Sequence, residues 1–240
     1  MTKFNRRSSR LEIMDDLSCG GEVVDQTLRE LDMINHWLGG NKVTIEGVAM
    51  LLKEVPYQQE IHIADLGCGS GEMLIQVAQW ARQNKRRVRL TGIDANPNII
   101  SYAEQHARNV PEITFEKYNI FSPEFKRKEF DVILATLFTH HLENVDLVSL
   151  LNTTAKQTRL GMVINDLHRH WLAYYSIRLL TRLCSRSAMV RFDAPISVLR
   201  GFKKSEWLKC LDEAGLRNFR IKWKWAFRWQ LVIPNSSHVA

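Results

Sequence analysis

The sequence lacks the features that would place it in several protein classes. Its 240 residues include only four cysteines, none in a CxxC pair, so we expect neither a disulfide framework nor a metal site. No apolar run reaches the roughly 18 to 20 residues that a membrane span needs, and the basic start lacks the apolar stretch of a secretory signal. There is no internal repeat. We therefore expect a cytoplasmic globular protein.

Acidic residues are the scarcer charge. Asp and Glu number 26 against 33 Lys and Arg, which gives a net charge of +7. The excess lies mainly in residues 1–10 and between Arg169 and Arg228. A basic surface of this kind can bind nucleic acid, anionic lipid or an acidic substrate, or it can simply be solvated. Composition alone leaves these alternatives open.

The first 56 residues carry no strand pattern. Apolar residues recur at helical spacing over 25–38, and Gly39-Gly40 ends that pattern. Thr44 is placed to cap a second helix that runs up to Pro56. We predict that residues 1–56 form a helical cap segment on a main domain spanning 57–240.

From Glu60 onward, short apolar strands alternate with amphipathic helices, which predicts a parallel sheet. A helical insertion interrupts the pattern at about 167–202, and Ser205 is the expected N-cap of the helix that follows. Two closing strands, 217–224 and 227–233, are near enough in sequence to form a hairpin. The expected fold is α/β: a seven-stranded, mostly parallel sheet with a C-terminal antiparallel hairpin and a helical cap.

A glycine-rich turn follows the first expected strand. The segment Asp65-Leu66-Gly67-Cys68-Gly69-Ser70-Gly71 joins that strand to a helix, so helical N–H groups point at any ligand bound there. A dinucleotide-binding turn would need a third glycine at position 72, which is glutamate, and no Gly-Lys-Ser/Thr run follows. The missing glycine and the missing Gly-Lys-Ser/Thr run argue against a bound pyrophosphate. The carboxylate of Glu72 beside the turn favours a ligand with positive charge.

Asp94 ends the second expected strand, where an acid can accept hydrogen bonds from both hydroxyls of a ribose. The turn and Gly92-Ile93-Asp94-Ala95-Asn96 resemble the first two motifs of class I S-adenosylmethionine-dependent methyltransferases, which have a Rossmann-like fold. The run from Phe130 to Leu142 resembles small-molecule methyltransferases of the ubiquinone/menaquinone type. The N-terminal helices and the insertion are similar to a subgroup found near bacterial polyketide genes.

The resemblance implies S-adenosylmethionine as the cofactor. It implies that Asp65 and Gly67 hold the methionine end, that Asp94 holds the ribose, and that Asn119 and Ile120 flank the adenine. Asn119 departs from the acid that the family usually has at this place, but its amide can still bond the adenine. Further cofactor contacts are expected at Cys68, Gly69, Ala95 and Ala135.

Histidines follow the fourth and fifth expected strands, near the end of the sheet where the methyl group should lie. We predict His168 as the general base, oriented by Asp166, with His141 as the second candidate. The alternative for His168 is a solvated loop without a catalytic role, and the alternative for His141 is a residue that packs against or caps the next helix. Trp37 and Tyr174 are expected to line the substrate pocket under the cap.

The most specific expectation is methyl transfer to a small-molecule acceptor, at an oxygen of a phenolic or polyketide-like compound. An RNA or protein methyltransferase is the first alternative. However, Ala135-Thr136-Leu137-Phe138 is not the Asn/Asp-Pro-Pro-Tyr run that binds the exocyclic amine of a base. Nucleic acid is therefore not expected as a partner. The second alternative is a cofactor-binding protein that does not methylate. The sequence does not determine the oligomeric state.

Overall fold

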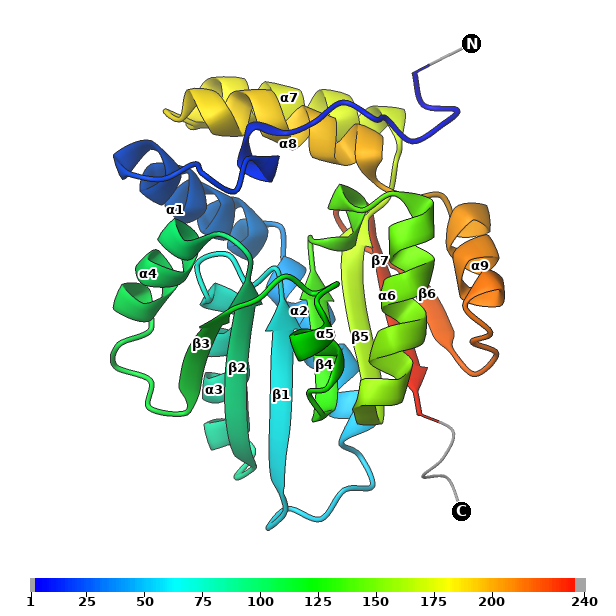
Figure 1. Cartoon of the computed structure of the whole chain (residues 1–240). Coiled ribbons are helices and arrows are strands. Elements are labelled where there is room, and N and C mark those ends of the chain that lie inside the picture. Colours follow the sequence, from blue (N-terminus) through cyan, green and yellow to red (C-terminus); the bar gives the residue numbers. More distant parts are fainter. Residues whose placement is uncertain (1–2, 236–240) are drawn as a thin grey trace.

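The computed structural model describes residues 3–235 and shows one open sheet with helices on both faces (Figure 1). The strand order is β3-β2-β1-β4-β5-β7-β6. All neighbouring pairs are parallel except β5–β7 and β7–β6, so the predicted seven strands and antiparallel C-terminal hairpin are confirmed. The strands are β1 (Glu60–Leu66), β2 (Arg87–Asp94), β3 (Ile113–Lys117), β4 (Phe130–Thr136), β5 (Thr158–Leu167), β6 (Arg220–Lys224) and β7 (Arg228–Pro234).

Two hydrophobic cores hold the helices against the sheet. On one face, α2 and α3 cover a core that includes Val48, Leu74 and Val77. On the other face, α5, α6 and α9 cover a core that includes Phe125 and Trp207. Burying each side chain of this size contributes about 1.5–3 kcal/mol to folding. The helices of the two layers are α2 (Gly40–Leu51), α3 (Glu72–Gln83), α4 (Pro97–His106), α5 (Pro123–Lys126), α6 (Asn144–Gln157) and α9 (Lys204–Glu213).

Two helix starts differ from the sequence-based prediction. Helix α2 begins at Gly40, so Thr44 lies inside it, where its hydroxyl bonds Thr136 on β4. Helix α9 begins at Lys204 and not after Ser205, because the Glu206 side chain accepts a hydrogen bond from the Lys203 backbone N–H. The N-cap of α2 is Gly39, which offers no side-chain cap, whereas at α9 the longer side chain of Glu206 takes over the capping.

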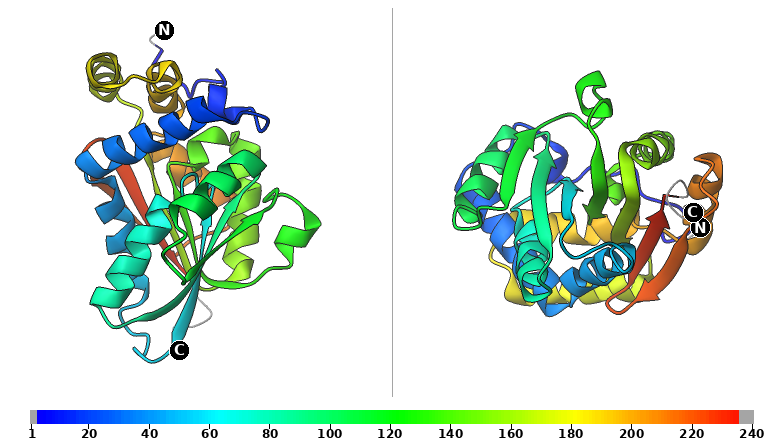
Figure 2. Two further views of the ribbon diagram at one scale, coloured as in Figure 1. Left: turned by 90° about the vertical axis from the view of Figure 1, so that its left-hand side faces the viewer. Right: turned by 90° about the horizontal axis from the view of Figure 1, so that it is seen from below.

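The remaining helices form a layer over the carboxyl ends of the strands, at the top of Figure 1. The insertion supplies α7 and α8, and the N-terminal segment supplies α1 and a short 3-10 helix that contacts α8. Figure 2 shows this layer from the side, lying across the sheet. These elements are η1 (Ile13–Asp15), α1 (Glu22–Trp37), α7 (Trp171–Cys184) and α8 (Ala188–Arg200); a further 3-10 turn, η2 (Thr139–His141), follows β4.

Candidate functional site

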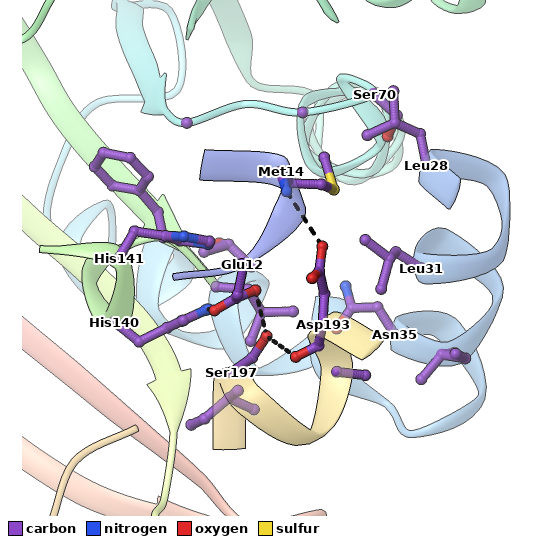
Figure 3. Close-up of a pocket in the computed structure, with 18 of the residues that line it drawn as sticks. Glu12, Met14, Leu28, Leu31, Asn35, Ser70, His140, His141, Asp193 and Ser197 are labelled. Atoms are coloured by element: carbon purple, nitrogen blue, oxygen red, sulfur yellow. Dashed lines mark hydrogen bonds and ion pairs between the residues drawn. The ribbon is translucent and has the colours of Figure 1, made fainter. Parts of the chain in front are cut away.

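A cavity of about 940 Å³ lies between the strand ends and the helical layer. Its floor comes from the loops after β1, β2, β3 and β4, and its roof comes from η1, α1, α7 and α8. Figure 3 shows part of this wall, with Leu28 and Leu31 of α1 facing His140 and His141 across the space. The volume is at the upper end of the roughly 300–1,000 Å³ typical of small-molecule sites. The cavity therefore has room for a cofactor and a second molecule.

The glycine-rich turn is fixed in a shape that only glycine adopts easily. The backbone N–H groups of Gly67 and Cys68 both donate to the Ile93 carbonyl, at 2.8 and 3.1 Å. Gly67 has φ +63°, and a Cβ there would collide with the ring of Phe138. The turn therefore needs glycine for its backbone conformation and for the close approach of the loop after β4.

Asp65 is a buried carboxyl group with an unsatisfied hydrogen-bond acceptor. It is 2% exposed, and its Oδ1 has no hydrogen-bond partner among residues 3–235. Burial, reinforced by the charge of Asp94, raises the pKa of Asp65 to about 7. Leaving such a group unpaired is costly, so this position is suited to a ligand that brings a positively charged amino group.

Asp94 also faces the cavity, at the end of β2. Its Oδ1 accepts a hydrogen bond from the Asn96 N–H at 2.9 Å, and burial raises its pKa. The capping of α4 is done by Asn96, whose side chain accepts from the N–H groups of Asn98 and Ile99. Asp94 is therefore not used as a helix cap, and its carboxylate is available to a ligand.

Eight of the nine predicted cofactor residues line the same cavity. The exception is Ala135, which is 4% exposed within the core of the sheet, while the next residue, Thr136, lines the cavity. The strand alternation that turns one residue outward buries its neighbour. The eight lining residues are Asp65, Gly67, Cys68, Gly69, Asp94, Ala95, Asn119 and Ile120.

His168 lies outside the described lining of the cavity. Its Nδ1 accepts a hydrogen bond from Trp223 Nε1 at 3.2 Å, and its ring packs edge-on against Trp229 of the terminal hairpin. Burial, with the charges of His170 and Arg169, lowers its pKa to about 4. Asp166 is bonded to His140 instead, so the predicted Asp166–His168 pair does not form.

The two aromatic residues predicted to line the substrate pocket are also placed elsewhere. Trp37, at the last position of α1, is 66% exposed. Tyr174 packs its ring against Phe4 and under the Lys3 ammonium, on the far side of α7 from the cavity lining. The helical face that turns inward is set by α7 packing on α8, and it carries Ser176, Ile177 and Leu180.

His140 and His141 stand at the cavity wall after β4, each held by a carboxylate. His140 Nδ1 lies 2.7 Å from Asp166 Oδ1, and His141 Nδ1 lies 2.6 Å from Asp15 Oδ1. His140 is buried, whereas the side chain of His141 is 25% exposed. Both imidazoles are therefore fixed in orientation, with Nδ1 as the donor to its carboxylate.

Glu12 completes a cluster that sequence analysis missed. One ligand atom from each of Glu12, His140 and His141 lies within 4.8 Å of the others, so the three could hold a metal ion. Burial raises the pKa of Glu12 to about 7. Its position near the N-terminus, in a segment without helical or strand periodicity, gave no signal that it would reach the loop after β4.

The binding of a positively charged ligand at Asp65 is expected to depend on pH. The ligand requires the ionised carboxylate, so its affinity should fall about tenfold per pH unit below 7. The ligand-free protein has the opposite preference: a carboxyl whose pKa is above its unfolded value of about 3.9 lowers stability as pH rises from 4 to 7. Calorimetric titration with S-adenosylmethionine at pH 5.5 to 7.5 measures the effect, and Asp65→Asn should flatten it. An affinity that does not change with pH would mean that Asp65 does not pair with the ligand.

Comparison with known proteins agrees with this geometry. A family model described as a methyltransferase domain matches residues 58–215, about two thirds of the chain. No curated protein matches the sequence. None of the described helices is long and apolar enough to span a membrane.

Solved structures share the fold at low sequence identity. Human N-acetylserotonin methyltransferase in complex with SAM has 16% identity and a TM-score of 0.61, covering 88% of this chain and 55% of that one. The DszA carbon methyltransferase has 16% identity and a TM-score of 0.60, covering 81% and 53%. The plantazolicin methyltransferase BpumL in complex with SAH has 21% identity and a TM-score of 0.57, covering 83% and 77%. The chain spans about half the length of the first two. The family match, the strand order and the glycine turn together show that this chain belongs to the methyltransferase-domain family and has the Rossmann-like fold of class I S-adenosylmethionine-dependent methyltransferases.

Proposed function

We propose that the protein transfers the methyl group of S-adenosylmethionine to an oxygen of a small, largely apolar acceptor, such as a phenolic or polyketide-like compound. The observation that carries this proposal is the cavity, which is continuous from the glycine turn to the space under the cap. The cap contributes mainly aliphatic side chains to it, including Ile177, Leu180, Val190 and Val198. Such a wall suits an aromatic or aliphatic body better than a polar polymer.

The cofactor's fit is supported by groups that otherwise lack partners. The buried Asp65 carboxylate would accept a hydrogen bond from the ammonium group of the methionine end. Asp94 would accept hydrogen bonds from the ribose hydroxyls. Asn119 and Ile120, after β3, would flank the adenine. S-adenosylmethionine supplies an electrophilic methyl group on a sulfonium. The protein's part is to hold the acceptor oxygen in line with the C–S bond.

The acceptor oxygen is best placed beside His140 and His141. These residues follow β4, the strand next to β1, and they line the same cavity as Asp65. We propose that His141, and not His168, lies beside the acceptor oxygen and helps to orient it. His141 is the more exposed of the pair, and the hydrogen bond to Asp15 fixes its ring.

The charge around the cavity argues against RNA as the acceptor. Among the described residues that line it, seven carry a carboxyl group and only Arg228 is a lysine or arginine. Several basic residues of the insertion and hairpin are buried in the fold: Arg169 pairs with Glu206, and Arg200 pairs with Asp15. A phosphate backbone approaching this mouth would meet repulsion rather than counterions.

The proposal is tested with S-adenosylmethionine that carries a deuterated methyl group. We expect mass spectrometry to find labelled methyl ethers on alkyl-substituted phenols, and no label on tRNA or on peptides. Label found only on RNA or protein would support the macromolecular alternative. Tight cofactor binding without transfer to any phenol would favour a protein that binds the cofactor and does not methylate.

A further inference from the structure

We propose that Glu12, His140 and His141 bind one divalent transition-metal ion at the acceptor end of the cavity. Figure 3 shows the three side chains turned toward one another, although they come from the N-terminal segment and the turn after β4. Their ligand atoms lie within 4.8 Å, and Glu12 Oε1 is 3.7 Å from His140 Nε2. Metal–ligand bonds of about 2.0–2.2 Å place ligand atoms about 3–4 Å apart, so only small side-chain adjustments are needed.

Hydrogen bonds to carboxylates orient both imidazoles as a metal site would need. Asp166 accepts a hydrogen bond from His140 Nδ1, and Asp15 accepts one from His141 Nδ1. With Nδ1 protonated, each neutral ring keeps its lone pair on Nε2. A carboxylate behind each histidine is the usual support of a metal-binding imidazole, because it fixes the ring and raises its basicity.

The buried carboxylate of Glu12 is a second, independent indication that a cation binds here. The residue is 7% exposed, and its Oε2 accepts a hydrogen bond from Ser197 Oγ at 2.6 Å. Its Oε1 is buried and has no hydrogen-bond partner among the described residues. This oxygen lies 3.7 Å from His140 Nε2 and 3.6 Å from Arg200 Nη1, beyond hydrogen-bond distance of either. A buried carboxylate oxygen left in this way costs free energy that a bound cation would recover.

The surroundings carry surplus negative charge. Four carboxyl groups lie around the cluster, from Glu12, Asp15, Asp166 and Asp193, whereas Arg7 and Arg200 supply two guanidinium groups. Arg200 Nη1 bonds Asp15 Oδ2 at 2.5 Å and is 3.6 Å from Glu12 Oε1, too far for a hydrogen bond. Arg228, which also lines the cavity and interacts electrostatically with Asp166, is a third guanidinium group near the cluster. The carboxyl groups still outnumber the guanidinium groups, and a bound cation would offset the difference.

The ligand set selects the kind of metal. Two imidazoles and one carboxylate suit Mn²⁺, Fe²⁺, Co²⁺ or Zn²⁺, whereas Mg²⁺ and Ca²⁺ prefer oxygen ligands. Three protein ligands leave positions open toward the cavity, where an acceptor hydroxyl could coordinate. This consequence rests on the proposed function. The hydroxyl would lose its proton to water, its oxygen would form the new C–O bond, and the C–S bond of the cofactor would break to leave the neutral thioether.

The test uses the full chain, stripped of metal by a chelator and dialysed. We expect Co²⁺ to give d–d absorption bands that saturate at one ion per chain, calorimetry with Mn²⁺ to give the same stoichiometry, and Mg²⁺ to bind at least 100-fold more weakly. Glu12→Gln and His141→Ala should each weaken Mn²⁺ binding by 100-fold or more. Asp15→Asn should weaken it 10- to 100-fold through the support of His141. His36→Ala, at an exposed position on α1, is the matched control and should bind as the unmodified protein does.

Two results would overturn the metal site. One is the absence of saturable binding at millimolar Co²⁺ and Mn²⁺; the other is stoichiometric binding that persists in both Glu12→Gln and His141→Ala. Circular dichroism checks that each variant is folded, and Asp15→Asn serves if either is not. The outcomes separate the two proposals. Methyl transfer by a protein that shows no saturable metal binding removes only the metal site, whereas stoichiometric metal binding without methyl transfer removes only the proposed function.

Discussion

Replacing Asp94 with alanine is expected to weaken S-adenosylmethionine binding roughly 30- to 1,000-fold. The carboxylate ends β2 inside the cavity and is not used as a helix cap, so a ribose would lose two hydrogen bonds to a charged acceptor. Such a loss costs roughly 2 to 4 kcal/mol. Calorimetric titration of both proteins with the cofactor measures the difference.

Glu104→Ala provides the matched control for that experiment. Glu104 is an exposed acid on the neighbouring helix α4, so removing it changes the same charge without touching the cavity. Its affinity should stay within about twofold. If Asp94→Ala also leaves the affinity unchanged, Asp94 does not hold the ribose, and the cofactor assignment based on β2 is wrong.

Replacing His141 with alanine is expected to lower turnover about 100-fold or more while cofactor affinity stays within a few-fold. The imidazole stands at the cavity wall and is fixed by Asp15, so its loss releases the acceptor oxygen from the reacting geometry. Misplacement by about 1 Å can cost two orders of magnitude in rate. Steady-state kinetics with a methylated phenol as product, together with cofactor titration, measures both quantities.

His168→Ala is the comparison that decides between the two histidines. His168 is bonded to Trp223 and lies outside the described cavity lining, so its removal should change turnover by less than about threefold. A loss of 100-fold in His168→Ala, with His141→Ala near normal, would restore the role that the sequence pattern gave to His168.

The sequence could place the glycine turn and Asp94 at one edge of the sheet because their signals are local. Asp65, Gly67 and Gly69 lie within five consecutive positions, at the point where an apolar strand gives way to a helix. The backbone of such a turn is set by glycine and by the strand that precedes it. Asp94 ends the adjacent strand, and parallel pairing of β1 and β2 brings both strand ends to the same edge.

The part of the cavity under the helical cap depends on contacts between distant segments, and there the predictions differ from the structure. Glu12 meets His140 across about half the chain. His168 follows β5, as expected, but an isolated bridge to Phe202 and the bond to Trp223 hold it outside the described cavity lining. Period-two or helical patterns identify a buried face, but they do not say which distant segment that face meets.

The sequence by itself determined the fold class, the seven strands, the antiparallel hairpin and the glycine-rich turn, because propensity, periodicity and glycine spacing act over a few residues. Only the tertiary structure decided which histidines line the cavity, and that Trp37 and Tyr174 lie outside its lining. It also decided that an N-terminal glutamate joins His140 and His141. These outcomes follow from how η1, α7 and α8 pack over the sheet. That packing depends on the burial of apolar surface between segments far apart in the sequence, which local sequence patterns do not specify.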